Sequence, residues 1–112
     1  MTDKELADKV VALGVGGHWD DRGYRYRLGI TDKLSVDAYA FVRAWRVAGA
    51  LIQKLCDSSP WGSMVLNPSG ESYNAYCETR KTEYSKARNA HTKQESLPRA
   101  INEACVEVLT ND

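Results

Sequence analysis

At 112 residues the chain has the size of one domain, and we expect a single domain over residues 1–112. Its hydrophobic fraction of 43% and charged fraction of 27% are ordinary for a globular protein and exclude disorder over most of the length. The 15 Lys and Arg residues balance the 15 Asp and Glu residues, which excludes a strongly basic nucleic-acid binder.

The N-terminal segment predicts a helix over Thr2–Leu13. Thr2 and Glu5 have the spacing of a capping box, in which each side chain satisfies an amide at the start of the helix. Apolar residues then recur every three or four positions and give the helix one apolar face. Gly14 suits the left-handed conformation that often ends a helix.

A strand is expected next over Tyr24–Ile30, because aromatic and aliphatic residues alternate there with arginines.

The clearest amphipathic pattern predicts one long helix from about Val36 to Leu55. Its apolar residues form a single stripe, which includes Phe41 and Trp45. We therefore expect Trp45 to be a core residue and not a binding residue. The segment Asp57–Pro60 ends the helix, because proline cannot continue it.

A β-hairpin is predicted to follow this helix. Its strands, Trp61–Leu66 and Ser72–Glu78, flank the segment Asn67–Gly70, whose residues suit a type I turn. A further strand is expected over Ser85–Thr92. The last helix is predicted to begin at Ser96, because serine is a strong N-cap and an apolar stripe follows it.

The order of these elements, α-β-α-β-β-β-α, predicts the α+β class. We expect a small three-layer α/β/α sandwich, in which the helices cover both faces of an at least partly antiparallel sheet. The strand order and the oligomeric state are left open by the sequence.

The helical run Phe41–Leu51 and the run Ser96–Cys105, with its pattern Ser-Leu-Pro-Arg-Ala-Ile, resemble small bacteriophage proteins that carry the phage ABA-sandwich domain. The opening helix Thr2–Leu13 is similar as well, whereas Trp61–Lys93 matches least. The resemblance implies an α/β/α fold and a phage or prophage origin, hence the cytoplasm of a bacterial host. It implies no activity and assigns no residue a role.

The three cysteines, Cys56, Cys77 and Cys105, are widely spaced and include no Cys-x-x-Cys pair. This spacing excludes a zinc site and a disulfide framework, so we expect no structural metal, no disulfide and a reducing cytosol. The acidic, polar start of the chain does not have the pattern of a signal peptide. No apolar run approaches the ~20 residues of a membrane span, so no membrane association is expected.

No residue pattern indicates catalysis or a bound cofactor. The cluster Gly14–Gly17 follows a helix and not a strand, so we interpret it as a helix stop and not as a phosphate loop. A cysteine nucleophile would need His18 or His91 beside it, whereas Cys105 lies on the apolar face of the last helix and is expected to be a small buried hydrophobe. We therefore expect a protein that is not an enzyme, holds no cofactor and has no metal site.

The segment that begins at Trp19 is the candidate binding site. Arginine and aromatic side chains are enriched in protein interfaces and also suit phosphate binding. No acidic residue lies between Arg22 and Arg27, and strand alternation puts Arg25 and Arg27 on one face. We predict a partner-binding role for Trp19, Arg22, Arg25 and Arg27. The alternative interpretation is an amphipathic strand whose tyrosines pack and whose arginines are solvated.

We expect a phage-encoded interaction protein that binds a host protein or protein complex, as an antagonist of host antiviral defence. Small phage accessory proteins without a catalytic set fit that class. The first alternative is a binder that sequesters a small anionic ligand, such as a nucleotide, through Arg25, Arg27 and nearby tyrosines. The second is a weak nucleic-acid binder that uses Thr79–Arg99, which contains six basic residues and only two acids. We do not favour it, because the net charge of the chain is zero.

Overall fold

The computed structural model describes residues 1–18, 25–29, 35–58 and 61–110. Four helices and two antiparallel three-stranded sheets make up the regular structure of this part of the chain, so the predicted α+β class is confirmed. The elements are α1 (Asp3–Ala12), β1 (Gly17–His18), β2 (Arg25–Arg27), β3 (Ser35–Asp37), α2 (Ala38–Val42), α3 (Trp45–Ser58), β4 (Trp61–Ser69), β5 (Ser72–Arg80), β6 (Arg88–Gln94) and α4 (Leu97–Thr110). None of the described helices is long and apolar enough to cross a membrane.

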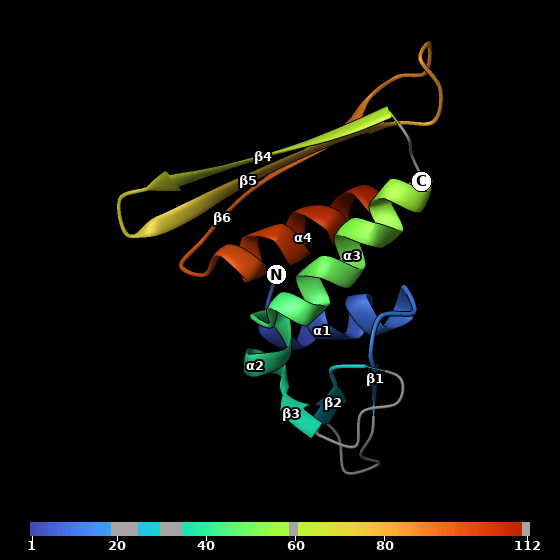
Figure 1. Cartoon of the computed structure of the whole chain (residues 1–112). Helices are drawn as coiled ribbons and strands as arrows, with labels where there is room; N and C mark the ends of the chain where they lie inside the picture. The colour runs from blue at the N-terminus through green and yellow to red at the C-terminus, as the bar shows by residue number, and fades with distance from the viewer. Residues whose placement is uncertain (19–24, 30–34, 59–60, 111–112) are drawn as a thin grey trace.

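Helix α4 lies between the larger sheet and the other helices (Figure 1). One side of α4 packs against β5 and β6, and another side packs against α1 and α3. The sheet presents small buried residues to α4, among them Ala75 and Cys77 on β5 and Ala90 on β6. The hydroxyl of Thr92 donates a hydrogen bond to the carbonyl of Ala100 at 2.7 Å. Small side chains let the helix approach closely, so this contact forms the centre of the core.

The first predicted helix and its boundaries are confirmed. Thr2 is the N-cap of α1, and its hydroxyl accepts a hydrogen bond from the amide of Glu5 at 3.1 Å. Gly14 follows the helix with a φ of +87°, the left-handed conformation that glycine adopts without strain. The last helix begins after Ser96, as its capping pattern predicts.

The larger sheet has the order β4-β5-β6 and contains the predicted hairpin. Its turn is shorter and lies later than predicted, because Ser69 pairs with Ser72 and only Gly70 and Glu71 connect the strands. Gly70 has a φ of +65°, which a type II′ turn requires at its first central position. Pro68 therefore lies within β4, and it is tolerated there because β4 is an edge strand.

The predicted long helix is divided into α2 and α3 at Arg43 and Ala44. Asn102 of α4 donates a hydrogen bond to the carbonyl of Val42 at 2.8 Å. This carbonyl lies at the end of α2, where a helix leaves its backbone acceptors unsatisfied. A side chain sixty residues later in the sequence thus satisfies the C-terminal end of α2.

The prediction that Trp45 is a core residue is wrong. Trp45 is the first residue of α3, and its side chain is 62% exposed. The buried stripe of α3 consists of Val47, Ala48, Leu51 and Leu55. Because the break interrupts the helical periodicity, the stripe that leads from Phe41 in α2 does not continue through Trp45.

The smaller sheet has the order β1-β2-β3 and includes part of the predicted strand. Strand β2 is shorter than Tyr24–Ile30, whose two end residues lie outside the described residues. Its central residue, Tyr26, is fully buried and stacks on Phe41 with ring centroids 5.1 Å apart. The Tyr26 hydroxyl donates a hydrogen bond to Asp8 at 2.7 Å, so the polar end of a buried ring is satisfied.

The order of the described elements is α-β-β-β-α-α-β-β-β-α and not the predicted α-β-α-β-β-β-α. The described helices that contact the larger sheet lie on one of its faces, and the opposite face carries exposed residues such as Val65 and His91. The predicted three-layer sandwich is therefore not confirmed. We call this uncovered surface the open face; its outward residues include Trp61, Val65, Tyr76, His91 and Lys93.

Candidate functional site

The predicted partner-binding residues are placed only in part. Trp19 and Arg22 lie outside the described residues. Arg25 is exposed at the start of β2, and Arg27 is half-buried at its end. The two arginines flank the buried Tyr26, which agrees with the predicted alternation. The partner-binding role of these four residues therefore stays a prediction.

The tertiary structure adds an acid that the local sequence does not show. Asp37 on β3 lies directly opposite Arg25 on β2. Residues paired in this way have their Cβ atoms only about 5 Å apart, so the carboxylate reduces the positive potential around the arginine. Asp37 also accepts a hydrogen bond from the amide of Ala40 at 2.9 Å and caps α2. The β2 surface is less basic than its sequence indicates.

The described residues concentrate positive charge at a different place, the end of the larger sheet where β5 leads into β6. A cavity of about 320 Å³ opens there, and four basic residues line it. These are Arg80, Lys81, Lys86 and Arg88. None of the described residues that line the cavity is acidic, although Glu78 lies 3.4 Å from the guanidinium of Arg80. We call this the basic cavity.

The remaining lining of the basic cavity is partly polar and partly apolar. Ser58, Thr79 and Ser85 bring hydroxyl groups, and Leu55 and Val108 bring aliphatic surface from α3 and α4. A volume of this size is within the range of small-molecule sites, which combine apolar walls with a few directed polar groups. The cavity is therefore suited to a small ligand with an anionic group and an apolar part.

Local structure holds the cationic side chains in place. Arg80 ends β5 and Arg88 begins β6, so both are fixed by the sheet. The connection between them contains a turn in which the amide and hydroxyl of Thr82 contact the hydroxyl of Ser85 at 3.2 and 2.8 Å. Lys81 and Lys86 lie on either side of this turn and are exposed. The hairpin thus gathers charges that are up to eight residues apart in sequence.

The ends of two helices supply a structural reason for positive charge at this place. Helix α3 ends at Ser58, and α4 ends at Thr110, close to the lining residue Val108. Helix C-termini carry a partial negative charge that cations stabilise, typically by about 0.3–1 kcal/mol each. The partial charges of two helix C-termini sum to about −1. Four cationic residues therefore bring more positive charge than the two helix ends balance.

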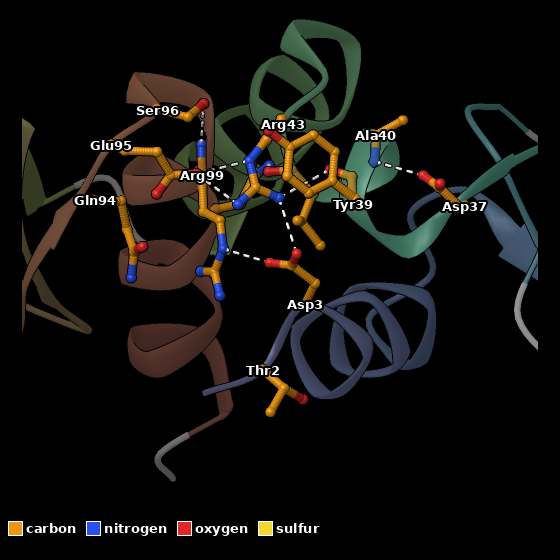
Figure 2. A network of polar contacts seen from close by, with 12 residues as sticks. Thr2, Asp3, Asp37, Tyr39, Ala40, Arg43, Gln94, Glu95, Ser96 and Arg99 are labelled. Atoms are coloured by element: carbon orange, nitrogen blue, oxygen red, sulfur yellow. Dashed lines mark hydrogen bonds and ion pairs between the residues drawn. The ribbon is translucent and has the colours of Figure 1, made fainter.

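A second cluster of charges is internally satisfied. Arg99, only 5% exposed in its side chain, contacts Asp3 and Glu103, each at 2.7 Å. Arg43 contacts Asp3 at 3.0 Å and also pairs with Glu95 (Figure 2). The network joins the start of α1 to the start of α4 and to the break between α2 and α3. Because each of these charges already has an opposite partner, we assign the network a structural role.

The pKa values in this network follow from its contacts. Burial alone raises the pKa of Asp3, but hydrogen bonds from Arg99 and Arg43 outweigh it, so the pKa of this carboxyl is lowered. A hydrogen bond from Arg43 lowers the pKa of Glu95 in the same way. Both carboxylates are therefore ionised at neutral pH, and the network keeps its charges there.

The buried cysteines do not form a nucleophilic site with a histidine in the described part of the chain. Cys77 and Cys105 are buried against each other between β5 and α4. A hydrogen bond with Cys77, together with burial, raises the pKa of Cys105, so its thiol remains protonated. His91 lies on the open face of the sheet, whereas Cys77 points toward α4. The predicted hydrophobic role of Cys105 is confirmed.

The sequence indicated the basic region but not which of its charges converge. Of the six basic residues in Thr79–Arg99, four line the basic cavity. Lys93 lies on the open face, and Arg99 belongs to the buried network. The signal in the sequence that could have located the cavity is the presence of basic residues at the end of one predicted strand and at the start of the strand that pairs with it. Comparison with protein-family models, with curated proteins and with solved structures finds no match, so the resemblance to ABA-sandwich proteins stays a prediction.

Proposed function

We propose that this chain is a binding protein without catalytic activity, and that it holds a small phosphate-bearing ligand in the basic cavity. The observation that carries the proposal is the presence of four basic residues around one cavity of about 320 Å³. This corresponds to the anionic-ligand alternative that the sequence left open, with a different set of residues from Arg25 and Arg27.

The chemistry of the lining fits a phosphate group. An arginine guanidinium presents a planar set of donors that matches phosphate oxygens, and lysines add point charges. Ser85 brings a hydroxyl group to the same cavity, whereas the Ser58 hydroxyl already donates to the carbonyl of Leu55. Leu55 and Val108 offer apolar surface for the part of the ligand that carries no charge. The described residues that line the cavity include no cysteine, histidine or carboxylate, which supports binding over catalysis.

Thermal unfolding with and without ligand tests this proposal. We expect inorganic pyrophosphate or a nucleoside triphosphate to raise the Tm, because a ligand that binds only the folded state stabilises it by mass action. At a ligand concentration of about 100 times Kd the stabilisation is about 2.7 kcal/mol, which corresponds to roughly 10 °C in a domain of this size. Calorimetric titration at constant ionic strength then checks that the shift reflects stoichiometric binding.

Charge reversal in the cavity supplies the matched variants. The double change Lys81→Glu and Lys86→Glu should abolish the ligand-induced shift while leaving the fold intact, since both side chains are exposed. Lys93→Glu, which reverses an exposed lysine on the open face, should keep the shift. Equal ligand shifts in all three proteins, or none in the parent, would contradict the proposal. Tight, salt-sensitive binding of single-stranded nucleic acid by the parent would instead favour the nucleic-acid alternative.

A second candidate function is recognition of a host protein, as an antagonist of host antiviral defence in the bacterial cytoplasm. Two large aromatic side chains near the break between α2 and α3 support it: Tyr39 is 60% and Trp45 62% exposed. The guanidinium of Arg43 lies 3.6 Å from the centre of the Tyr39 ring. Exposed aromatic residues beside arginine are typical of interface hot spots. If this surface binds a protein, the double change Tyr39→Ala and Trp45→Ala should abolish co-purification of one stoichiometric partner and leave the ligand shift unchanged.

A further inference from the structure

The outer edge of β4 is one of the two unpaired strand edges of the larger sheet in the described part of the chain. In the described part of the chain no strand pairs with this edge, because β4 is the first strand in the order β4-β5-β6. In Figure 1 it is the strand farthest from the helices along the top of the sheet. An edge strand presents a row of backbone donors and acceptors that a second strand can use.

The turn determines which backbone groups of β4 point outward. Ser69 and Ser72 close the two-residue turn and form a hydrogen-bonded pair. Hydrogen-bonded and non-hydrogen-bonded pairs alternate along an antiparallel ladder. The residues whose amide and carbonyl groups point away from β5 are therefore Gly62, Met64 and Leu66, followed by Pro68. Pro68 fits this assignment, since it has no amide hydrogen to donate to β5.

The two edges of the sheet differ in charge. Strand β6, at the far edge, carries Arg88, His91 and Lys93, and lysines and arginines on an edge strand oppose pairing with another chain. Strand β4 carries no charged residue over Trp61–Ser69. It instead exposes large apolar side chains on both faces, with Val65 48% exposed on the open face and Leu66 41% exposed on the face toward α4. This edge lacks the charges that protect the other one.

We infer that two copies of this chain form a homodimer by antiparallel pairing of their β4 edges, which joins the two sheets into one sheet of six strands. The inference rests on β4 alone and does not depend on the basic cavity. A two-fold axis at Met64 pairs Met64 with its own copy, and Gly62 with Leu66 of the second copy. Each of these three pairs supplies two backbone bonds, about six in all.

Other symmetric registers pair less completely. An axis at Val65 places Pro68 opposite Gly62 of the second copy and also gives about six bonds, but the missing proline amide leaves the Gly62 carbonyl of each copy without a donor. An axis at Leu66 places Pro68 opposite Met64 in the same way and gives about four bonds. An axis at Ser63 pairs only Gly62 with Met64, because the strand begins at Trp61. The Met64 register is therefore the one in which the amide and the carbonyl of Gly62, Met64 and Leu66 all have a partner.

The same register joins the exposed apolar side chains. On the face toward α4, Met64 meets Met64 of the second copy, and Leu66 lies diagonal to it and opposite Gly62, which has no side chain to obstruct it. On the open face Trp61, which is 52% exposed, lies diagonal to Val65 of the second copy. Diagonal neighbours are within reach of aromatic and long side chains. In the dimer, the exposed apolar side chains of β4 in one copy therefore contact those of β4 in the other copy.

Sedimentation or light scattering from low micromolar to submillimolar concentration tests the dimer. The parent should change from the mass of one chain, 12.5 kDa, to twice that mass. Leu66→Lys places an ammonium group beside Met64 of the second copy, so the dissociation constant should rise at least about tenfold, equivalent to about 1.4 kcal/mol. Tyr84→Lys is the matched control, because Tyr84 is an exposed aromatic residue in the loop after β5 and its variant should dimerise like the parent.

A cross-link checks the register, in a Cys56→Ser and Cys77→Ala background that removes the exposed thiol and the thiol opposite Met64 on β5. Met64→Cys should form a covalent dimer on mild oxidation, because a hydrogen-bonded pair has its Cα atoms about 5.5 Å apart, within disulfide range. Asn67→Cys should not, since six residues at about 3.3 Å separate it from its copy by about 20 Å. A parent that is monomeric throughout, a dimer that Leu66→Lys does not weaken, or equal cross-linking of both cysteine variants overturns the inference.

Discussion

Arg99 and Asp3 connect the two ends of the described chain. Arg99 donates to the carboxylate of Asp3 at 2.7 Å and to the carbonyl of Met1 at 2.8 Å. Its guanidinium is almost fully buried, and a buried charge is tolerated only when it is paired and hydrogen-bonded. Asp3 therefore fixes the N-terminus of α1 against α4. Trp45 shows the opposite situation, a large apolar side chain left in solvent by the break that precedes it.

The lowered pKa of Asp3 predicts how stability depends on pH. Because the folded-state pKa is below the usual 3.8, the unfolded chain binds the proton more readily than the folded chain. The stabilisation is complete above the usual value and is lost as pH falls through the lowered folded-state value. Asp3→Asn should lower the free energy of unfolding at neutral pH by about 2 kcal/mol and flatten this acid dependence.

Urea unfolding followed by circular dichroism between neutral pH and the acid range measures both effects. Glu5→Gln is the control, because Glu5 is an exposed acid of the same helix. Its stability and acid dependence should resemble those of the parent. If Asp3→Asn had the same stability and acid profile as the parent, the ion pairs of Asp3 would contribute nothing to folding.

Among the elements, the break between α2 and α3 depends on a residue of α4. Asn102 is fully buried, and its amide donates to the carbonyl of Val42. Arg43, within the break, also donates to the carbonyl of Tyr39 at 3.1 Å. Side chains thus replace the backbone donors that a continuous helix would have offered. The α2–α3 corner is therefore a tertiary feature, supported from outside the segment that forms it.

Removing the Asn102 donor tests this support. Asn102→Leu keeps the number and branching of the side-chain heavy atoms but leaves the Val42 carbonyl without its donor, which should lower the free energy of unfolding by about 1–3 kcal/mol. Asn89→Leu, a change of the same kind at an exposed position of β6, should alter stability by less than about 0.5 kcal/mol. Equal stability of the two variants in denaturant titrations would show that the corner does not need Asn102.

The whole molecule is held together by the contact between α4 and the larger sheet. Cys77 on β5 and Cys105 on α4 are both buried within that contact, whereas Cys56 on α3 is exposed. The three thiols therefore report on different parts of the fold. Cys56 is accessible in the native state, and the other two become accessible only when sheet and helix separate.

Thiol labelling measures this opening. One thiol should react at once in native buffer, and three should react in denaturant. The two buried thiols should react at least about a thousandfold more slowly than Cys56, as expected when exposure requires unfolding against about 5 kcal/mol. Cys56→Ser should remove the fast phase alone. Rapid reaction of all three thiols in native buffer would mean that the α4–sheet contact is not a stable core.

The sequence by itself determined the elements whose signals are local. The cap at Thr2, the alternation around Tyr26, the hairpin and the start of α4 at Ser96 are each encoded within a few residues, so pattern and capping rules locate them. The turn of the hairpin lies later than predicted. The residues Asn67–Gly70 suit a type I turn, whereas the pairing of Ser69 with Ser72 places a two-residue type II′ turn at Gly70 and Glu71.

Only the tertiary structure decided the features that depend on distant partners. The position of Trp45 was mispredicted because an unbroken helical period would bury it, and the break is supported by Asn102, about sixty residues away. The basic cavity needs the ends of two strands and two helices to meet, and the candidate arginine Arg25 acquires Asp37 only when β2 pairs with β3. Such contacts join residues that local periodicity cannot relate, because a pattern fixes which face of an element is apolar but not which element will cover it.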